Sequence, residues 1–232
     1  MIDITNIDTS GWQGAIRGMR NSYASWDKSD SVCGIYGIDF DDDKTVGQSG
    51  KMFLMGPNDL ELASRLAKLG GPHAKFRRMI HVQCDIKAPL FWWKQFDTYK
   101  VGTVANSTST MHSITKKEFT VDDFSQNNMM SAQFGMQLLS TVNVLNELRT
   151  KYLEEKNRPL KKMYWDDIIH LLPDCYNQLR TVDMNYEVVS QMVAYRLYHK
   201  LDEWQEFCRK MMANLPYARE LIFDVTPDPD TK

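Results

Sequence analysis

A helix is predicted to start after Gly56-Pro57, because apolar residues recur there at helical spacing until the pair Gly70-Gly71 ends the pattern. Asn58 and Glu61 have the spacing of a capping box, so we expect Asn58 to cap this helix. The apolar face of the predicted helix is formed by Leu62, Leu66 and Leu69.

The next segment changes to the period of a strand. Residues 79–86, MIHVQCDI, alternate apolar and polar side chains, which predicts a strand. Pro89 can then open a short aromatic helix, LFWWKQF. The aromatic side chains of this region are interpreted as core rather than as a cofactor site: Trp92, Trp93, Phe96 and Tyr99.

Two long helices are predicted in the second half of the chain, over about 121–152 and about 185–212. A polar interruption at 154–162, EEKNRPLKK, separates helical regions. Strands are therefore expected only before residue 120. This segregation predicts the α+β class, with a small antiparallel sheet packed against long helices.

The chain has 232 residues, of which 43% are hydrophobic and 25% charged, enough to bury a core of its own. Residues 41–51 are expected to form a loop. The Pro- and Asp-rich end, 226–232, is expected to be disordered. With no long linker in between, the sequence predicts a single domain over 1–225.

Charge and hydropathy exclude several classes of protein. Lys plus Arg number 28 and Asp plus Glu 30, a net charge of −2, which argues against a protein that coats nucleic acid. No apolar run is long enough to span a bilayer, and the N-terminus lacks the pattern of a signal peptide. The four cysteines are far apart and are expected to be reduced thiols, which favours a cytoplasmic protein with no membrane partner.

Common catalytic and metal-binding motifs are absent from the sequence. It contains no GxSxG, P-loop, HExxH or GxGxxG, and its five histidines have no metal-ligand spacing. We therefore expect no metal. A basic run at 73–81, HAKFRRMIH, can meet phosphates or can simply be solvated.

Two features remain as candidate chemistry. Between Lys100 and Lys116 the chain is rich in hydroxyl residues, which can hold a phosphate in a turn or form a solvated loop: Thr103, Ser107, Thr108, Ser109, Thr110 and Ser113 are among them. Arg196 falls beside the apolar stripe of a predicted helix, where its guanidinium needs polar partners. It either forms a structural ion pair, with Asp202 or Glu203, or faces a planar ligand with a polarised carbonyl.

Several segments resemble the flavin-dependent thymidylate synthases, over roughly residues 15–212. The stretch SRLAKLGGPHAKFRR is similar to a family segment in which a Gly-His pair precedes Pro-Phe-Glu-His. The stretch IKAPLFWWKQF resembles the family's strand-to-helix segment, which ends in Arg-Gln-Trp in the family. The family's Arg-His-Arg triplet is replaced by Thr98, Tyr99 and Lys100. Asn106-Ser107 falls where the family has Asn-Glu, Ser109 matches the family serine, and 110–112 replace Gly-Arg-Tyr.

The C-terminal half resembles the family in its spacing. Pro173 and Asn185 are 185 − 173 = 12 residues apart, and Asn185 and Arg196 are 196 − 185 = 11 residues apart, as in the family. The segment DEWQEF is similar to the family's Ala-Gln-Trp-Glu. By this resemblance, Arg196 is the arginine that binds and polarises the pyrimidine.

The resemblance implies that the protein methylates dUMP to dTMP, or alkylates a related pyrimidine nucleotide. It implies FAD as the hydride carrier, methylene-tetrahydrofolate and NADPH as co-substrates, and a homotetramer with flavin and nucleotide bound between subunits. Arg196 is then catalytic. Substrate binding falls to Gln95, Ser107, Ser109 and Arg196, and cofactor binding to Arg78, Lys100, Asn106, Asn185 and Gln191.

The altered signature leaves two alternatives open. The chain can be a catalytically inactive relative that binds a nucleotide or serves as a structural subunit. A nucleic-acid-binding module that uses the basic run at 73–78 and the pair Lys116-Lys117 is the other alternative, although the net charge disfavours it.

Overall fold

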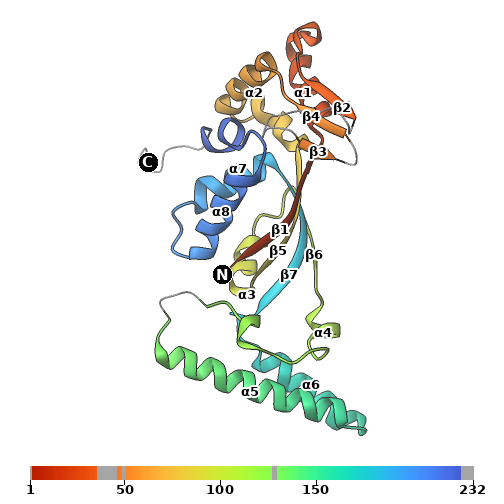
Figure 1. The fold of residues 1–232 in the computed structure, drawn as a ribbon, viewed down its shortest axis with the longest axis vertical. Helices are drawn as coiled ribbons and strands as arrows, with labels where there is room; N and C mark the ends of the chain where they lie inside the picture. The colour runs from red at the N-terminus through yellow and green to blue at the C-terminus, as the bar shows by residue number, and fades with distance from the viewer. Residues whose placement is uncertain (1, 36–45, 49–50, 127–129, 226–232) are drawn as a thin grey trace. The chain divides into compact units, whose positions relative to one another are not determined.

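The computed structural model describes residues 2–35, 46–48, 51–126 and 130–225 (Figure 1). The chain divides into two compact units. Unit 1 comprises Met1–Asp3, Lys87–Asp97 and Asn106–Arg180, and unit 2 comprises Ile4–Ile86, Thr98–Ala105 and Thr181–Lys232. Each unit is described by itself.

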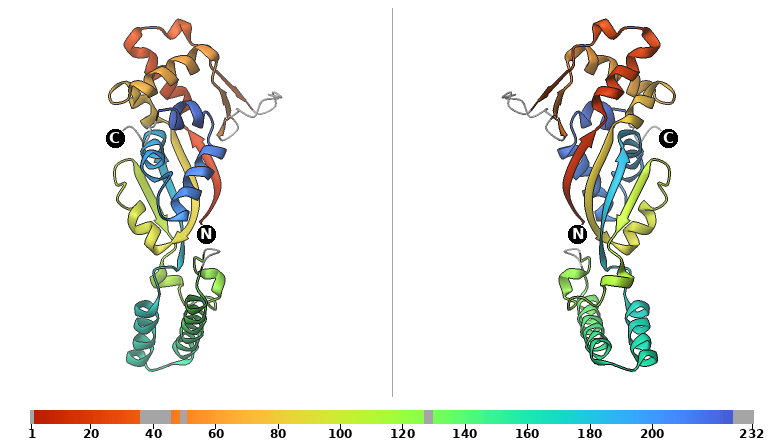
Figure 2. Two further views of the ribbon diagram at one scale, coloured as in Figure 1. Left: turned by 90° about the vertical axis from the view of Figure 1, so that its left-hand side faces the viewer. Right: turned by 90° about the vertical axis from the view of Figure 1, so that its right-hand side faces the viewer.

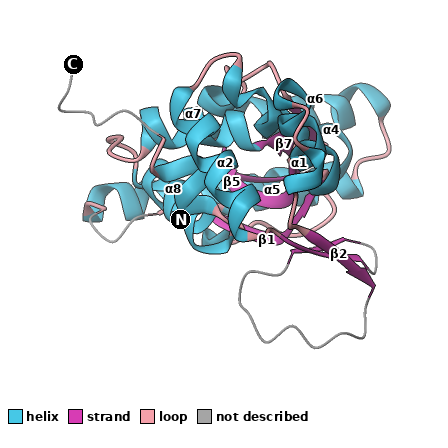
Figure 3. Cartoon of the chain, turned by 90° about the horizontal axis from the view of Figure 1, so that it is seen from above, coloured by secondary structure: helices cyan, strands magenta, loops and turns pink. Residues whose placement is uncertain are grey.

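One sheet has the strand order β1-β5-β7-β6. Its strands β1, β5 and β7 are labelled in Figure 3. A second, antiparallel sheet has the order β2-β4-β3. The strands are β1 (Asp3–Ser10), β2 (Val32–Ile35), β3 (Val46–Gln48), β4 (Lys51–Leu54), β5 (His81–Pro89), β6 (Thr103–Ser107) and β7 (Asn177–Asn185).

The helices of unit 2 pack on one another around an apolar core. They are α1 (Trp12–Arg20), α2 (Pro57–Leu69), α7 (Tyr186–Arg196) and α8 (Asp202–Asn214), with 3₁₀ segments η1 (Asn21–Tyr23), η2 (Trp26–Lys28) and η3 (His73–Met79) and a π-helical turn η5 (Arg219–Phe223). The segment η3 contacts α1, α2 and α7. At the centre Trp12 packs edge-on against Tyr186, with ring centroids 5.1 Å apart. Burial of such large side chains is the main stabilising contribution to the unit.

Unit 1 contains a helical hairpin formed by α5 (Ala132–Glu154) and α6 (Arg158–Leu171), which lie side by side (Figure 2). Ser131 and Asn157 cap the two helices through their side-chain oxygens. The shorter elements of the unit are α3 (Leu90–Phe96), α4 (Thr110–Ser113) and the 3₁₀ turn η4 (Val121–Asp123). The apolar core of the hairpin consists of Ile114, Phe119, Phe124, Leu138, Val142, Leu145 and Ile168.

The predicted α+β class is confirmed, and so are several elements. The aromatic helix is α3, with Trp92, Trp93 and Phe96 buried. The polar interruption at 154–162 does separate two helices, α5 and α6. The four cysteines are free thiols. Strand β5 begins at His81, two residues later than predicted, because Met79 belongs to η3.

Predictions about helix ends were partly wrong. The N-cap of α2 is Gly56, and Asn58 lies inside the helix. Its carboxylate cap comes from elsewhere in the chain, because Asp30 accepts hydrogen bonds from the backbone N–H groups of Asn58 and Asp59. A side chain on Gly56 would collide with Asp30, whose Cγ lies 2.3 Å from the position of a Cβ. Leu69, placed on the apolar face, is 61% exposed.

The predicted helix over 121–152 was wrong at its start. Thr120 and Asp123 form a capping box around the short turn η4, and Phe124 then pairs as a β-bridge with Tyr176. The α-helix begins only after Ser131, which accepts a hydrogen bond from the backbone N–H of Phe134.

The predicted helix over 185–212 is two helices, α7 and α8. The helical backbone is interrupted between Leu197 and Leu201, where the ring nitrogen Nδ1 of His199 accepts a hydrogen bond from the backbone N–H of Leu201. The expectation that strands lie only before residue 120 was also wrong, because β7 lies at Asn177–Asn185. The predicted loop at 41–51 contains β3 and the first residue of β4, and its remaining residues lie outside the described residues. The tail at 226–232, predicted to be disordered, also lies outside the described residues.

Candidate functional site

Helix α7 places two of the candidate residues at its two ends. Asn185 is both the last residue of β7 and the N-cap of α7, where its side-chain Oδ1 accepts the backbone N–H of Val188 over 3.1 Å. Arg196 is the last residue of the same helix. The strand therefore continues directly into a helix whose far end carries the guanidinium; the sequence predicted the helix but not the strand.

The Arg196 guanidinium is held by two aromatic side chains. Its Nε donates a hydrogen bond to the hydroxyl of Tyr99 over 3.0 Å. Its Cζ lies 5.0 Å from the ring centroid of Trp204, a fully buried residue of α8. A cation over an aromatic ring is attracted by the ring's quadrupole, so Trp204 stabilises the charge in this orientation.

The segment 98–102 lies along α7. Gly102 contacts the first turn of the helix, because a Cβ at this position would fall 2.6 Å from Nδ2 of Asn185. Tyr99 contacts the last turn through Arg196. Lys100, between them in sequence, is exposed, and so is Gln191 on α7. Within unit 2 the fold thus places four candidate residues on α7 or on the segment beside it: Lys100, Asn185, Gln191 and Arg196.

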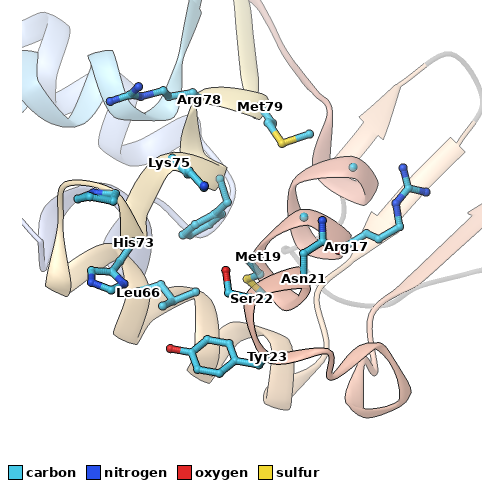
Figure 4. Close-up of a pocket in the computed structure, with 14 residues that line it drawn as sticks. Arg17, Met19, Asn21, Ser22, Tyr23, Leu66, His73, Lys75, Arg78 and Met79 are labelled. Carbon is cyan, nitrogen blue, oxygen red and sulfur yellow. The ribbon is translucent and has the colours of Figure 1, made fainter.

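A cavity of about 840 Å³ lies in unit 2 between α1, η1, α2 and η3 (Figure 4). The Met79 side chain covers the side of α1 that carries Gly14 and Gly18. A Cβ added at Gly14 would lie 3.5 Å from Met79 Cε, and one added at Gly18 would lie 3.5 Å from Met79 Sδ. The lining is mainly apolar and aromatic, with basic groups at several points. It is formed by Gly14, Arg17, Gly18, Met19, Asn21, Ser22, Tyr23, Leu66, Pro72, His73, Lys75, Phe76, Arg78 and Met79.

The three cations of the cavity do not point in the same direction. The ammonium of Lys75 points toward the middle of the cavity, whereas the guanidiniums of Arg17 and Arg78 lie at its sides and point outward (Figure 4). Lys75 is thus the basic group best placed to meet a bound anion, since both arginines are directed to the rim.

Arg78 is engaged by a carboxylate. Its Nε and one terminal nitrogen both donate to Glu187, in the first turn of α7. These hydrogen bonds, together with the charge of Glu187, raise the pKa of Arg78. The pair joins the wall of the cavity to α7, and Glu187 balances part of the charge that Arg78 would otherwise offer to a phosphate.

The neighbouring Arg77 points the other way and has a structural role. It is buried, and one of its terminal nitrogens donates to Ser190 Oγ over 3.1 Å and to the carbonyl of Leu221 over 2.9 Å. Burial lowers the pKa of Arg77, while the nearby Glu187 acts in the opposite direction. The basic run at 73–81 therefore divides its cations between the core and the cavity.

Four of the candidate residues lie in unit 1. Asn106 and Ser107 end β6 and are exposed, and Ser109 is the N-cap residue of α4. The backbone carbonyl of Ser109 accepts the backbone N–H of Ser113 over 3.0 Å, so the hydroxyl-rich segment does form a turn. Gln95 lies half-buried on α3. The other five candidates, Arg78, Lys100, Asn185, Gln191 and Arg196, belong to unit 2.

Sequence reasoning missed Arg17 and Tyr23 in the cavity and the role of Trp204 beside Arg196. The sequence held one signal for Arg17: it is a basic residue on the exposed side of α1, next to the buried Ile16. Among the described residues no group of three His, Cys, Asp or Glu side chains could hold a metal ion. No helix in the described part of the chain is long and apolar enough to cross a membrane.

The fold defined by these sheets and helices is that of the flavin-dependent thymidylate synthases. Two solved structures that share it are both of thymidylate synthase ThyX from Helicobacter pylori with FAD and dUMP. One is 14% identical, with a TM-score of 0.66 over 98% of this chain and 100% of that chain. The other is 15% identical, with a TM-score of 0.64 over 96% and 100%. No protein-family model matches the sequence, and no curated protein matches it.

Proposed function

We propose that this chain binds FAD and a pyrimidine deoxynucleotide and alkylates the pyrimidine, converting dUMP to dTMP or acting on a related nucleotide. The observation that carries the proposal is the position of Arg196 at the end of α7, fixed by Tyr99 and Trp204, on a fold shared with ThyX structures that contain FAD and dUMP. A planar cation in a set orientation can bind and polarise a pyrimidine carbonyl.

In this proposal catalysis depends on positioning and electrostatics. Arg196 withdraws electron density from the base through its carbonyl, which makes the ring carbon more reactive. The exposed Ser107 and the N-cap residue Ser109, with Gln95, supply hydrogen bonds for the rest of the nucleotide. When bound, reduced FAD supplies the hydride, with methylene-tetrahydrofolate as the carbon source and NADPH as the reductant.

The cavity of unit 2 fits a phosphorylated ligand with a planar ring. Its volume of about 840 Å³ is in the range of small-molecule sites, and Phe76 and Tyr23 offer aromatic surface. Lys75 supplies a central positive charge, and Arg17 and Arg78 add charge at the rim. We propose that this cavity binds part of FAD. That Lys100, Asn106, Asn185 and Gln191 also bind the cofactor is proposed from the resemblance alone.

A homotetramer is part of the proposal, because the resemblance places flavin and nucleotide between subunits. The candidate residues then come from several copies of the chain. Gel filtration coupled to light scattering tests this directly: a mass near four times 27.0 kDa supports it, and a monomer at working concentration contradicts it.

The flavin is tested first by titration. Purified protein with saturating FAD should show flavin absorption near ~450 nm and a raised melting temperature. A protein that neither retains FAD nor gains thermal stability from it is not a flavoenzyme. Lys75→Met should weaken FAD binding about tenfold, because it removes the central cation. Lys68→Met, an exposed lysine of α2 outside the cavity lining, is the matched control and should leave FAD binding unchanged.

The second candidate function is a nucleotide-binding relative without turnover. Two observations favour it: Arg78 is engaged by Glu187, and uncharged Thr98 and Tyr99 stand where the resemblance places charged flavin contacts. The test is release of tritium from C5 of labelled dUMP in the presence of FAD, NADPH and methylene-tetrahydrofolate. Release supports the enzyme, whereas tight dUMP binding without release supports the inactive relative.

A further inference from the structure

Three residues from separate segments meet at the end of α7. Tyr99 lies in the segment after α3, Arg196 ends α7, and Trp204 lies in α8. The rings of Tyr99 and Trp204 have centroids 6.0 Å apart and an interplanar angle of 62°, an edge-to-face contact. The Arg196 Cζ lies 5.8 Å from the Tyr99 ring and 5.0 Å from the Trp204 ring. The guanidinium therefore has aromatic surface on two sides.

The Tyr99 hydroxyl sets the rotation of the guanidinium as well as its position. A guanidinium is planar, so a hydrogen bond at Nε fixes the direction of the edge formed by its two terminal nitrogens. Trp204 is anchored by its own edge-on contact with Phe207, at 5.6 Å and 83°, and is fully buried. The aromatic support is thus part of the core, and Tyr99 contributes a directional contact between the segment 98–102 and Arg196.

We propose that Tyr99 is a positioning residue for Arg196 in nucleotide binding; this inference rests on the proposed function. The resemblance places position 99 in a triplet that contacts the flavin. In this chain the side chain at that position instead binds the residue proposed to hold the pyrimidine. Tyr99 acts through Arg196, so its loss affects dUMP binding only while Arg196 is present.

The test is a double-mutant cycle on FAD-loaded protein with dUMP as the ligand. Tyr99→Phe keeps the ring and removes only the hydroxyl. We expect it to weaken dUMP binding about tenfold in the Arg196 background, and to have no further effect in an Arg196→Gln background. Tyr198→Phe, an exposed tyrosine nearby in the sequence, is the matched control and should leave dUMP affinity unchanged.

The outcomes separate this inference from the proposed function. If the natural protein binds dUMP and Tyr99→Phe weakens binding equally in both Arg196 backgrounds, Tyr99 does not act through Arg196 and the inference is wrong. Unchanged affinity in Tyr99→Phe leads to the same conclusion. If the natural protein, loaded with FAD, binds no dUMP at all, the proposed function fails and the inference fails with it. Melting temperatures of the natural protein, the two single variants and the double variant identify any variant that loses binding by unfolding.

Discussion

Gly102 packs directly against the side chain of Asn185, with no room for a Cβ between them. Its φ of +80° lies in the left-handed region, and the Cβ of any other residue would fall 2.6 Å from Asn185 Nδ2 and 3.1 Å from Val188 Cγ2. Asn185 cannot easily move away, because its Oδ1 caps α7. The close approach therefore couples the segment 98–102 to the start of the helix that carries Arg196.

Gly102→Ala should consequently destabilise the protein. We expect the free energy of unfolding to fall by about 2 kcal/mol or more, from backbone strain at positive φ and displacement of the cap. Gly135→Ala is the control, since Gly135 lies in α5 and, apart from the neighbouring backbone of that helix, no heavy atom of the described residues comes within 4 Å of the added Cβ. It should raise stability by about 0.5–1 kcal/mol. Urea denaturation measures both, and equal stability of the two variants would contradict the close contact.

Arg196→Lys tests the need for a planar, stacked cation. Lysine keeps the charge but loses the Nε donor to Tyr99 and the flat face against Trp204. We expect turnover of dUMP to fall at least about tenfold, with the melting temperature little changed. Arg209→Lys, on the exposed side of α8, should be neutral in both assays. An unchanged rate in Arg196→Lys would remove this residue from the site.

The buried pair Arg20–Asp59 predicts a pH dependence of stability. Burial acts to raise the pKa of Asp59, but hydrogen bonds from Ser31, Ser29 and Arg20 outweigh it and hold the pKa below its usual value. A carboxyl whose pKa is lower in the folded state stabilises the fold at pH values above its unfolded pKa, about 3.9, and loses that contribution as the pH falls through the folded pKa.

Asp59→Asn should therefore lower the free energy of unfolding by about 3–5 kcal/mol at pH 7, because it leaves Arg20 buried without its carboxylate. Below about pH 4 the difference between variant and natural protein should shrink. Denaturation curves between pH 2.5 and 7 measure it. Asp27→Asn, at an exposed position, is the control. A difference that stays constant down to the lowest pH would argue against the lowered pKa.

The cysteines should differ sharply in reactivity. Burial raises the pKa of Cys84 and of Cys208 to about 12 each, so almost no thiolate forms at pH 8. Cys33 is exposed. Iodoacetamide followed by peptide mass spectrometry should show rapid labelling of Cys33, with Cys84 and Cys208 labelled only after denaturation. Early labelling of either buried cysteine would show that its region opens readily.

The sequence predicted the elements whose apolar side chains recur at regular spacing or follow a clear start signal. Helix α3 follows a proline and buries three aromatic side chains, so its start and its packing were both visible. Strand β7 was missed because inward positions carry polar groups. Gln178 is buried through a hydrogen bond to the carbonyl of Thr108, and Arg180 covers the face of Trp93 at 4.2 Å. Such contacts come from distant segments, and they mask the alternation that marks a strand.

The break between α7 and α8 was missed for a related reason. Leu197 and Leu201 are both partly buried, so the apolar stripe continues in phase through the interruption. The turn is made by the His199 ring, which accepts the backbone N–H of Leu201, and by Gln205, which donates to the His199 carbonyl. Hydrogen bonds of this kind leave no periodic signal in the sequence.

Among the candidate residues, the spacing of Asn185 and Arg196 predicted a shared helix, and the structure has it. The cavity was not predicted, because its basic groups come from α1 and η3, which are more than fifty residues apart in the sequence. Arg78 was considered a phosphate ligand, but its partner Glu187 lies beyond any local pattern. Charge pairing between remote segments has to be seen in the fold.

Since β7 runs into α7 without a loop, the position of Asn185 in the strand determines where the helix begins. The 196 − 185 = 11 residues to Arg196 correspond to about three turns, which returns the guanidinium to the side of the helix on which Asn185 lies. Inserting one residue anywhere between them would rotate that group by about 100° around the axis, away from both aromatic rings. The length of this helix is therefore under tighter constraint than most of its composition.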